Sequence, residues 1–188
     1  MNRRHCKKAL GLSDSKPVVL CIAGNLQDNR KGSVFLKKLN SSGLIEKAQF
    51  VYIGAGRLEH FSHPSTLALG FLRDELSLQI AYCAADLLIH PALIDNLPNT
   101  VAESMGCGTP ALSYAVGGLP DMVVPHKSGW LVRELDVDSM LQTLDSLLSG
   151  NALSQIREST RAHAKSLFST RIVGDQYKSH FTSYLTKE

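Results

Sequence analysis

The sequence lacks the features that mark several large classes of protein. Among its 188 residues there are only four cysteines and one tryptophan. No apolar run approaches the length of a transmembrane helix, and no signal-peptide apolar segment follows the basic start. The net charge of +3 is mild, whereas nucleic-acid-binding domains usually carry a concentrated basic stripe. We therefore expect a globular protein with no membrane-spanning segment and no nucleic-acid partner.

The cysteines also lack the spacings that mark metal or disulfide sites. Cys6, Cys21, Cys83 and Cys107 form no C-x-x-C pair and have no histidines at zinc-site spacing. Cys21 and Cys83 stand among apolar residues, so we expect buried, reduced thiols, as a reducing cytoplasm maintains. We interpret the one dense basic run, residues 2–8, as a solvated terminus. The expected location is cytoplasmic, with a role at the inner membrane surface left open.

Short apolar runs of strand length alternate with segments at helical spacing. The expected strands are Val18–Ala23, Phe50–Ile53, Thr66–Leu69, Leu87–His90, Ala111–Tyr114 and Trp130–Val132. The expected helices are Ser33–Leu39, Leu76–Ala84, Pro98–Met105 and Val137–Leu148, the last capped by Asp136 and stopped by Gly150. Continuously apolar strands suit a parallel sheet covered on both faces. We predict an α/β fold, a doubly wound parallel six-stranded sheet with helices on both faces, of Rossmann-like type.

The chain reads as one domain. Residues 1–16 are polar and predict a lead-in or interdomain linker, and residues 17–188 predict a single Rossmann-like domain. Two further helices, Ala152–Phe168 and Arg171–Leu185, are expected to pack across the sheet or beyond it.

Ligands of such sheets bind at the carboxyl ends of the strands, so the loops that follow the strands are the candidate sites. In the first of these loops Gly24 allows a sharp exit, and Arg30 and Lys31 offer cations to an anion. In the second, Gly54 and Gly56 leave space for a flat or bulky group or simply form a turn. Neither loop completes the dinucleotide-binding pattern G-x-G-x-x-G.

The stretch HPALIDNLPNTVAESMGCGTPAL, residues 90–112, carries the strongest signal. Pro98 suits the first turn of a helix because its missing N–H costs nothing there. The free N–H groups of Asn99, Thr100 and Val101 then point out of a helix end with partial positive charge, which favours an anion such as a phosphate. The alternative is that Asn96 or Asn99 merely caps the helix.

Two acids flank this helix start. Glu103 lies one turn inside the helix among apolar neighbours, and a buried carboxylate needs a partner, either a cation or a pair of sugar hydroxyls. Asp95 lies in the loop before the helix and is either a ligand to hydroxyls or a plain turn residue. One strand later the pair Gly117–Gly118 either lines the same crevice or makes a turn. A diphosphate with hydroxyls at both ends fits this arrangement.

At these residues the chain resembles the C-terminal lobe of the retaining glycosyltransferases of family four, which have the two-lobed GT-B fold. The resemblance runs in order from about Lys16 to Thr186. It rests on AGNLQDNRKG, VYIGAGRL, the long block LALGFLRDELSLQIAYCAADLLIHPALIDNLPNTVAESMGCGTPALSYAVGGLPDMV, SGWLV and FSTRIVGDQY. The long block is highly specific, and the shorter pieces are correctly ordered.

The resemblance implies a site for a nucleotide-sugar donor. The family's paired acids, separated by seven residues, correspond to Asp95, which would contact the donor sugar, and Glu103, which would hold the ribose hydroxyls. The family's arginine is replaced by Asn25, while its lysine is kept as Lys31. The implied catalytic residues are Asp95 and Lys31. The implied donor-binding residues are Gly24, Asn25, Arg30, Gly54, Leu72, Arg73, Asn96, Leu97, Asn99, Thr100 and Glu103, with the backbone of Leu72 and Arg73 near the base.

The implied reaction is transfer of a sugar from a nucleoside diphosphate with retention at the anomeric carbon, in polysaccharide or glycolipid synthesis. The class usually works without a bound metal, so we expect no metal or cofactor. An N-terminal, acceptor-binding lobe would be the missing partner, with peripheral membrane contact through that lobe left open. The alternatives are one lobe of a nucleotide-sugar epimerase and a non-catalytic nucleotide-binding module.

Overall fold

The computed structural model describes residues 1–185, without the side chains of residues 58 and 60, and its centre is a six-stranded parallel sheet. The strands are β1 (Val18–Asn25), β2 (Gln49–Ala55), β3 (Thr66–Gly70), β4 (Leu87–His90), β5 (Ala111–Tyr114) and β6 (Gly129–Val132). Their order across the sheet is β3-β2-β1-β4-β5-β6, and every neighbouring pair is parallel. The predicted six-stranded parallel sheet is confirmed.

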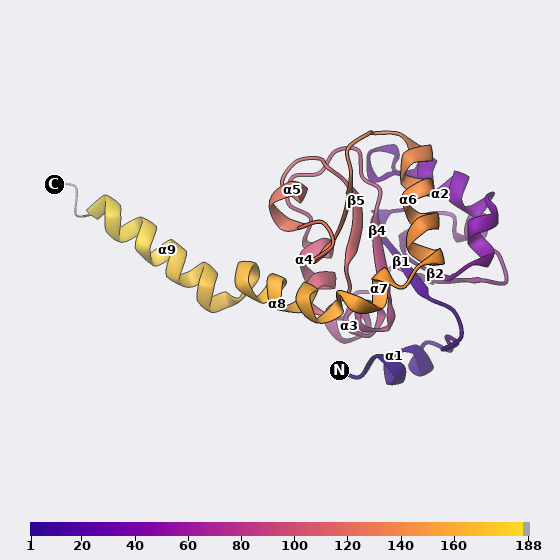
Figure 1. Cartoon of the computed structure of the whole chain (residues 1–188), viewed down its shortest axis with the longest axis horizontal. Coiled ribbons are helices and arrows are strands. Elements are labelled where there is room, and N and C mark those ends of the chain that lie inside the picture. Colours follow the sequence, from indigo (N-terminus) through magenta and orange to yellow (C-terminus); the bar gives the residue numbers. More distant parts are fainter. Residues whose placement is uncertain (186–188) are drawn as a thin grey trace.

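Helices cover both faces of this sheet (Figure 1). One face packs against α2 (Ser33–Asn40) and α6 (Val137–Ser149). The other packs against α3 (Glu75–Ala84), α4 (Asn99–Gly106), α5 (Leu119–Met122) and α8 (Arg157–Phe168). Successive strand residues point to opposite faces, so Val19 of β1 joins the first apolar core and Leu20 joins the second. Short helical turns at η1 (Asn29–Lys31), η2 (Gly43–Glu46) and η3 (Leu58–Phe61) complete the connections.

The strand order changes direction between β1 and β4. After β1 the chain forms β2 and β3 on one side of β1. It then crosses back and forms β4 on the other side of β1. In open α/β sheets, ligands bind at the carboxyl ends of the strands, near the point where the strand order reverses. The loops after β1 and β4 are those that the sequence predicts to bind the ligand.

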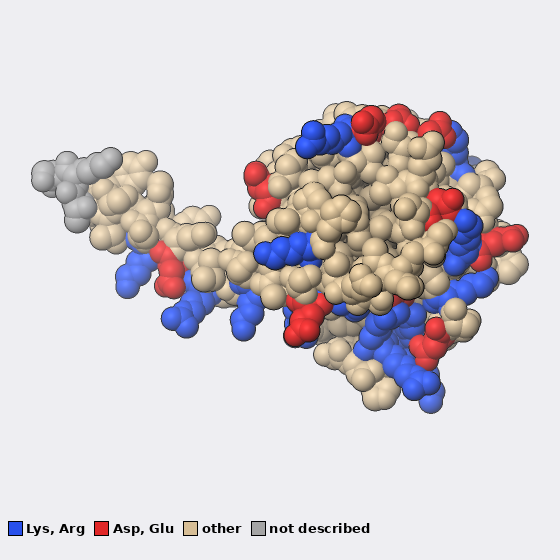
Figure 2. Space-filling model, viewed as in Figure 1, with Lys and Arg blue, Asp and Glu red and all other residues tan. Residues whose placement is uncertain are grey.

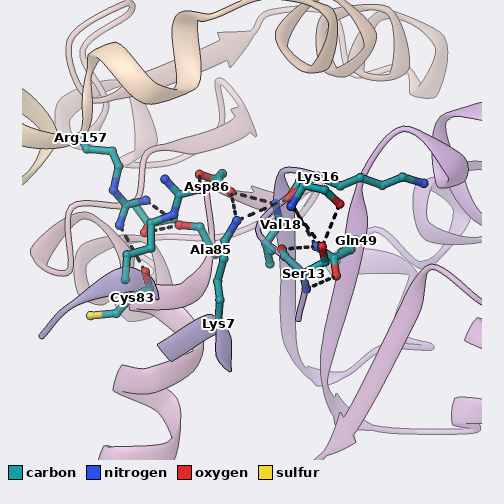
Figure 3. Close-up of polar contacts among 12 residues, drawn as sticks. Lys7, Ser13, Lys16, Val18, Gln49, Cys83, Ala85, Asp86 and Arg157 are labelled. Carbon is teal, nitrogen blue, oxygen red and sulfur yellow. Dashed lines mark hydrogen bonds and ion pairs between the residues drawn. The ribbon is translucent and has the colours of Figure 1, made fainter. Parts of the chain in front are cut away.

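The interpretation of residues 2–8 as a solvated terminus is wrong, because two of these residues are buried. The first sixteen residues contain α1 (Arg3–Ala9), which lies beside α3 and buries Cys6 and Lys7. The ammonium group of Lys7 lies 3.2 Å from Asp86 Oδ2, which also accepts a hydrogen bond from Val18 N at 2.9 Å (Figure 3). Arg3 pairs with the same carboxylate. The basic helix α1 is held here because Asp86, just before β4, supplies a buried acid.

The C-terminal region also differs from the prediction. The expected helix Ala152–Phe168 is two helices, α7 (Ala152–Gln155) and α8, separated at Ile156, whose side chain enters the core. The last helix, α9 (Thr170–Leu185), has no buried residue and extends away from the domain (Figure 1). Basic side chains lie along the lower side of this arm and gather over α1 (Figure 2).

Candidate functional site

The start of α4 is an open helix end. Pro98, predicted in the first turn, instead stands at the N-cap position just before it, and no side chain caps the helix. The N–H of Val101 donates to Pro98 O at 3.1 Å, so it is not free as predicted. Among the described residues, the N–H groups of Asn99 and Thr100 have no acceptor. The alternative that an asparagine caps the helix is therefore wrong, and two amides remain for a ligand.

The loops that follow β1 and β4 pack directly on each other. Leu93 N donates to Arg30 O at 2.9 Å. Gly32, in the left-handed conformation with φ of 86°, lies so close to Pro91 that a Cβ there would come 2.2 Å from the Pro91 carbonyl oxygen. Only glycine permits this approach. The close packing brings the end of the first loop beside the loop that leads into α4.

Lys31 and Asp95 meet at this junction. Lys31 Nζ lies 2.8 Å from Asp95 Oδ2, and the same oxygen lies 3.0 Å from His90 Nε2. Because a carboxylate only accepts, the His90 ring donates this bond. Asn96 N donates to the other oxygen at 3.0 Å. Asp95 is thus neither a plain turn residue nor a free carboxylate, since it joins the two loops. The Lys31 side chain keeps 36% of its surface exposed.

The titration of this cluster follows from its burial and charges. Burial acts to raise the pKa of Asp95, but the hydrogen bond from Lys31, with contributions from His90 and from Asn96 N, lowers it below its ordinary value. Burial lowers the pKa of His90 by more than its contact with Asp95 raises it. At neutral pH the cluster is therefore a neutral histidine beside a charged lysine–aspartate pair.

Three residues predicted in the first loop have other roles. Arg30 is exposed and binds Asp28 with two hydrogen bonds, at 2.8 and 3.2 Å, so its guanidinium is paired rather than free. Asn25 accepts a hydrogen bond from Gln27 N at 2.9 Å and shapes the turn. Gly24 lies inside β1 rather than at a sharp exit, and a Cβ there would meet nothing within 4 Å. The space beside its Cα is therefore not filled by other atoms.

The glycines of two other loops allow close packing. Gly54, with φ of 149°, approaches the Ala23 carbonyl so closely that a Cβ would lie 2.0 Å from its oxygen. Gly117, with φ of 53°, sits equally close to Asp95, and Gly118 N donates to Asn96 O at 2.6 Å. Thus Gly117–Gly118 packs directly against the loop before α4.

Three further predicted residues lie at or near the surface. Leu97 is exposed beside the start of α4. Leu72 is partly buried and Arg73 is exposed, both in the connection from β3 to α3. No side-chain contact ties Arg73 to the loops after β1 and β4 among the described residues.

Glu103 is not buried, contrary to the expectation from its apolar neighbours. Val101 and Met105 face the core, while Glu103 points outward from α4. Tyr82, on α3, donates a hydrogen bond to Glu103 Oε2 at 2.8 Å. No lysine or arginine in residues 1–185 pairs with this carboxylate. It lines an open groove of about 350 Å³ between α3 and α4. The sequence showed the acid but not its tyrosine partner, because the two are on separate helices.

The sequence contains one Asp-x-Asp pair, a pattern that can bind a metal ion, at the start of α6. Asp136 accepts a hydrogen bond from Ser139 N at 2.8 Å and caps the helix, and Asp138 pairs with Lys38 at 2.5 Å. Both acids have structural partners away from the crevice. Within the described part of the chain, no three or more His, Cys, Asp or Glu side chains are grouped to hold a metal ion. None of the helices in residues 1–185 combines the length and apolar character needed to cross a bilayer.

Comparison with known proteins places this chain in a family. A model of the family described as glycosyl transferases group 1 matches residues 16–150, and the chain belongs to this family. The architecture is that of the C-terminal domain of a GT-B glycosyltransferase.

Curated relatives are named glycosyltransferases. The chain is 28% identical over 179 residues to a D-inositol 3-phosphate glycosyltransferase of Mycobacterium marinum, covering 87% of this chain and 37% of the relative. It is 27% identical over 193 residues to a GDP-mannose-dependent monoacylated alpha-(1-6)-phosphatidylinositol monomannoside mannosyltransferase of Corynebacterium glutamicum, covering 90% and 48%. The chain therefore spans less than half the length of these two relatives.

Solved structures share the fold. Sucrose-phosphate synthase from Thermosynechococcus elongatus superposes with a TM-score of 0.82 at 21% identity, covering 100% of this chain and 50% of the other. The catalytic domain of Starch Synthase IV from Arabidopsis thaliana, bound to ADP and acarbose, gives 0.75 at 22% identity, covering 99% and 42%.

Proposed function

We propose that this chain is the nucleotide-sugar donor-binding domain of a retaining glycosyltransferase of family four, acting in polysaccharide or glycolipid biosynthesis. Family membership supports sugar transfer. The observation that carries the donor role is the open start of α4, where the Asn99 and Thr100 amides have no acceptor in residues 1–185. A helix start with free amides favours a phosphate group, and this one follows β4, where the strand order reverses beside β1.

Lys31 supplies the cation beside this helix end. An ammonium group has three N–H donors, and Asp95 occupies one of them. The exposed part of the side chain leaves the other two available to a diphosphate. Lys31 and the α4 amides would then stabilise the negative charge that grows on the departing diphosphate, which is electrostatic preorganisation. Asp95, held by Lys31 and His90, would present its remaining lone pairs to a hydroxyl of the donor sugar.

Glu103 would hold the ribose at the other end of the diphosphate. It lies four residues after Asn99, and four residues rise about 6 Å along a helix. Its carboxylate is open to the groove and carries no paired cation among the described residues. The backbone of Leu72 and Arg73 would face the base. We expect the donor to bind without a metal ion or cofactor.

The rest of the enzyme would be a second lobe that binds the acceptor. The curated relatives are more than twice as long as the part that this chain matches, so we propose that transfer takes place only when that lobe is present. One relative is named for a phosphatidylinositol monomannoside substrate, which supports a peripheral membrane contact through the same lobe. The free thiols of all four cysteines suit a cytoplasmic location.

Calorimetric titration of the chain with UDP, GDP, ADP and their sugars tests this proposal. We expect weak binding of one nucleoside diphosphate series and no sugar transfer by the chain alone. Glu103→Ala should lower affinity by about tenfold or more, since hydrogen bonds to a charged group are lost. Glu75→Ala, which removes another acid from the same groove, is the matched control and should bind like wild type. Binding of none of these nucleotides would refute the proposal.

One observation favours a second candidate, a non-catalytic nucleotide-binding module. The position of the family's arginine holds Asn25, whose side chain serves the turn, and Arg30 is paired with Asp28. The crevice therefore has one flexible cation, Lys31, where the family pattern has two. Sugar-transfer assays on the protein with its acceptor lobe separate the two, because the module would bind donor without consuming it.

A further inference from the structure

The hydrogen bond between Tyr82 and Glu103 joins a fixed group to an exposed one. Tyr82 is 2% exposed, so its ring is locked in the core between α3 and the sheet. Its hydroxyl reaches out to Glu103 Oε2 at 2.8 Å, across the groove between α3 and α4. An exposed glutamate normally samples many rotamers, but this bond fixes the carboxylate against a rigid support.

The direction of this bond does not change with pH in the physiological range. Burial raises the pKa of Tyr82 well above its ordinary value, and the bond to Glu103 raises it further. The phenol therefore stays protonated and can only donate to the carboxylate. A carboxylate has about four lone-pair sites, of which Tyr82 uses one. No other described residue bonds to the Glu103 side chain, so Oε1 is available to a ligand.

The geometry points to a specific use for the available oxygen. Resting on the function proposed above, we propose that Tyr82 is a positioning residue, whose hydroxyl orients Glu103 so that its carboxylate accepts hydrogen bonds from the two ribose hydroxyls of a nucleoside diphosphate. Glu103 sits one turn from the open helix start, with the side chain turned into the groove. A carboxylate that is already oriented loses less rotational freedom when the ribose binds.

A purely structural role predicts a different pattern. If the bond only holds α3 to α4, its loss lowers the stability of the domain and weakens the binding of every nucleotide to the same extent. If it orients Glu103, its loss reduces the preference for ribose over a sugar without the hydroxyls. The ratio of affinities for a nucleoside diphosphate and its 2′,3′-dideoxy analogue separates the two roles.

The experiment is calorimetric titration of the chain with the best-binding nucleoside diphosphate and with its 2′,3′-dideoxy analogue. Wild type should prefer the ribose form by about tenfold or more. Tyr82→Phe keeps the buried ring and removes the donor. It should reduce this preference by about twofold to tenfold, while affinity for the dideoxy analogue stays unchanged.

The control variant is Tyr114→Phe. Tyr114 is also a buried tyrosine with one hydroxyl bond, to Asp136 O at 2.9 Å, and its ring packs on the opposite face of the sheet. The Tyr114→Phe variant should be less stable than wild type but should keep the preference for the ribose form. Thermal melting of each variant verifies folding.

The outcomes separate the inference from the function on which it rests. If Glu103→Gln abolishes the preference and Tyr82→Phe keeps it in full, the inference is overturned and the proposed function stands. If wild type binds no nucleoside diphosphate, both are overturned. Should Tyr82→Phe fail to fold, Glu103→Asp replaces it. The side chain, shorter by one methylene, cannot reach Tyr82 and the ribose together, so an undiminished preference in that variant overturns the inference.

Discussion

The buried carboxylate of Asp86 gives the most direct test of how the N-terminal residues join the domain. The Asp86 side chain is 6% exposed and is contacted by three groups from two segments: Lys7 and Arg3 of α1 and the N–H of Val18 in β1. The substitution is Asp86→Ala. It leaves the Lys7 ammonium, 3% exposed, with one long contact to the Lys16 carbonyl oxygen at 3.4 Å (Figure 3).

The expected loss of stability follows from the charge that the substitution leaves unpaired. Removing one partner of a buried ion pair costs about 3–5 kcal/mol, because the other charge remains without compensation. For a domain of this size, 1 kcal/mol shifts Tm by about 2–4 °C, so the expected fall in Tm is about 6–20 °C. Lys7→Met should cost less, since the carboxylate keeps Arg3 and the Val18 N–H and the thioether fills the space left by the stem.

The assay is urea unfolding at pH 7, followed by circular dichroism, for wild type, both single variants and the double variant. The double variant Lys7→Met/Asp86→Ala should be more stable than Asp86→Ala alone, because it carries no stranded ammonium. An Asp86→Ala variant within about 1 kcal/mol of wild type, well under the expected loss, would refute the reasoning. So would a double variant no more stable than Asp86→Ala.

Three further outcomes are expected. Burial lowers the pKa of His90 below 6.5, so its contribution to stability is complete above about pH 6.5 and is lost as pH falls through the folded pKa. In urea titrations from pH 7 to 5, the free energy of unfolding should therefore decline less for His90→Asn than for wild type. Gly117→Ala should lower Tm by several degrees, since a Cβ there meets the Asp95 carbonyl oxygen at 1.9 Å and φ is 53°; Gly43→Ala, which meets nothing within 4 Å, should be nearly neutral, and equal Tm values would contradict this. Burial raises the pKa of Cys21, so mass spectrometry after iodoacetamide treatment should find this thiol unmodified in the native protein and modified after unfolding; native labelling of Cys21 would show that β1 opens.

The elements of the sheet could be predicted because their signals are local. The apolar run Leu87–His90 is β4 with its predicted bounds. Asp136 caps α6 and Gly150 follows its last residue, as predicted. A cap bonds to an amide three residues away, so neighbouring residues carry all the information that it needs. The signal for the start of α4 at Pro98 is also local, because the geometry of the proline ring by itself favours a helix start.

The contacts that define the candidate site are of another kind. Lys31 and Asp95 are 64 positions apart, and Tyr82 and Glu103 are 21 apart on separate helices. Neither pairing is encoded in a short window of sequence, because each exists only when the sheet brings the two chain segments together. The same reason explains why Glu103 was expected to be buried. Apolar neighbours indicate that a helix has a buried face, but the docking of that helix decides which residues face outward.

The sequence by itself determined the six strands, the helices between them and the cap of α6, and it marked the start of α4 as a possible phosphate site. Only the tertiary structure decided that α1 docks on a buried acid, that Asp95 is held by Lys31 and His90, and that Glu103 faces a groove with a tyrosine behind it. Local geometry depends on residues within one or two turns of the chain. A buried charge or an oriented carboxylate depends on partners that only the packed sheet supplies.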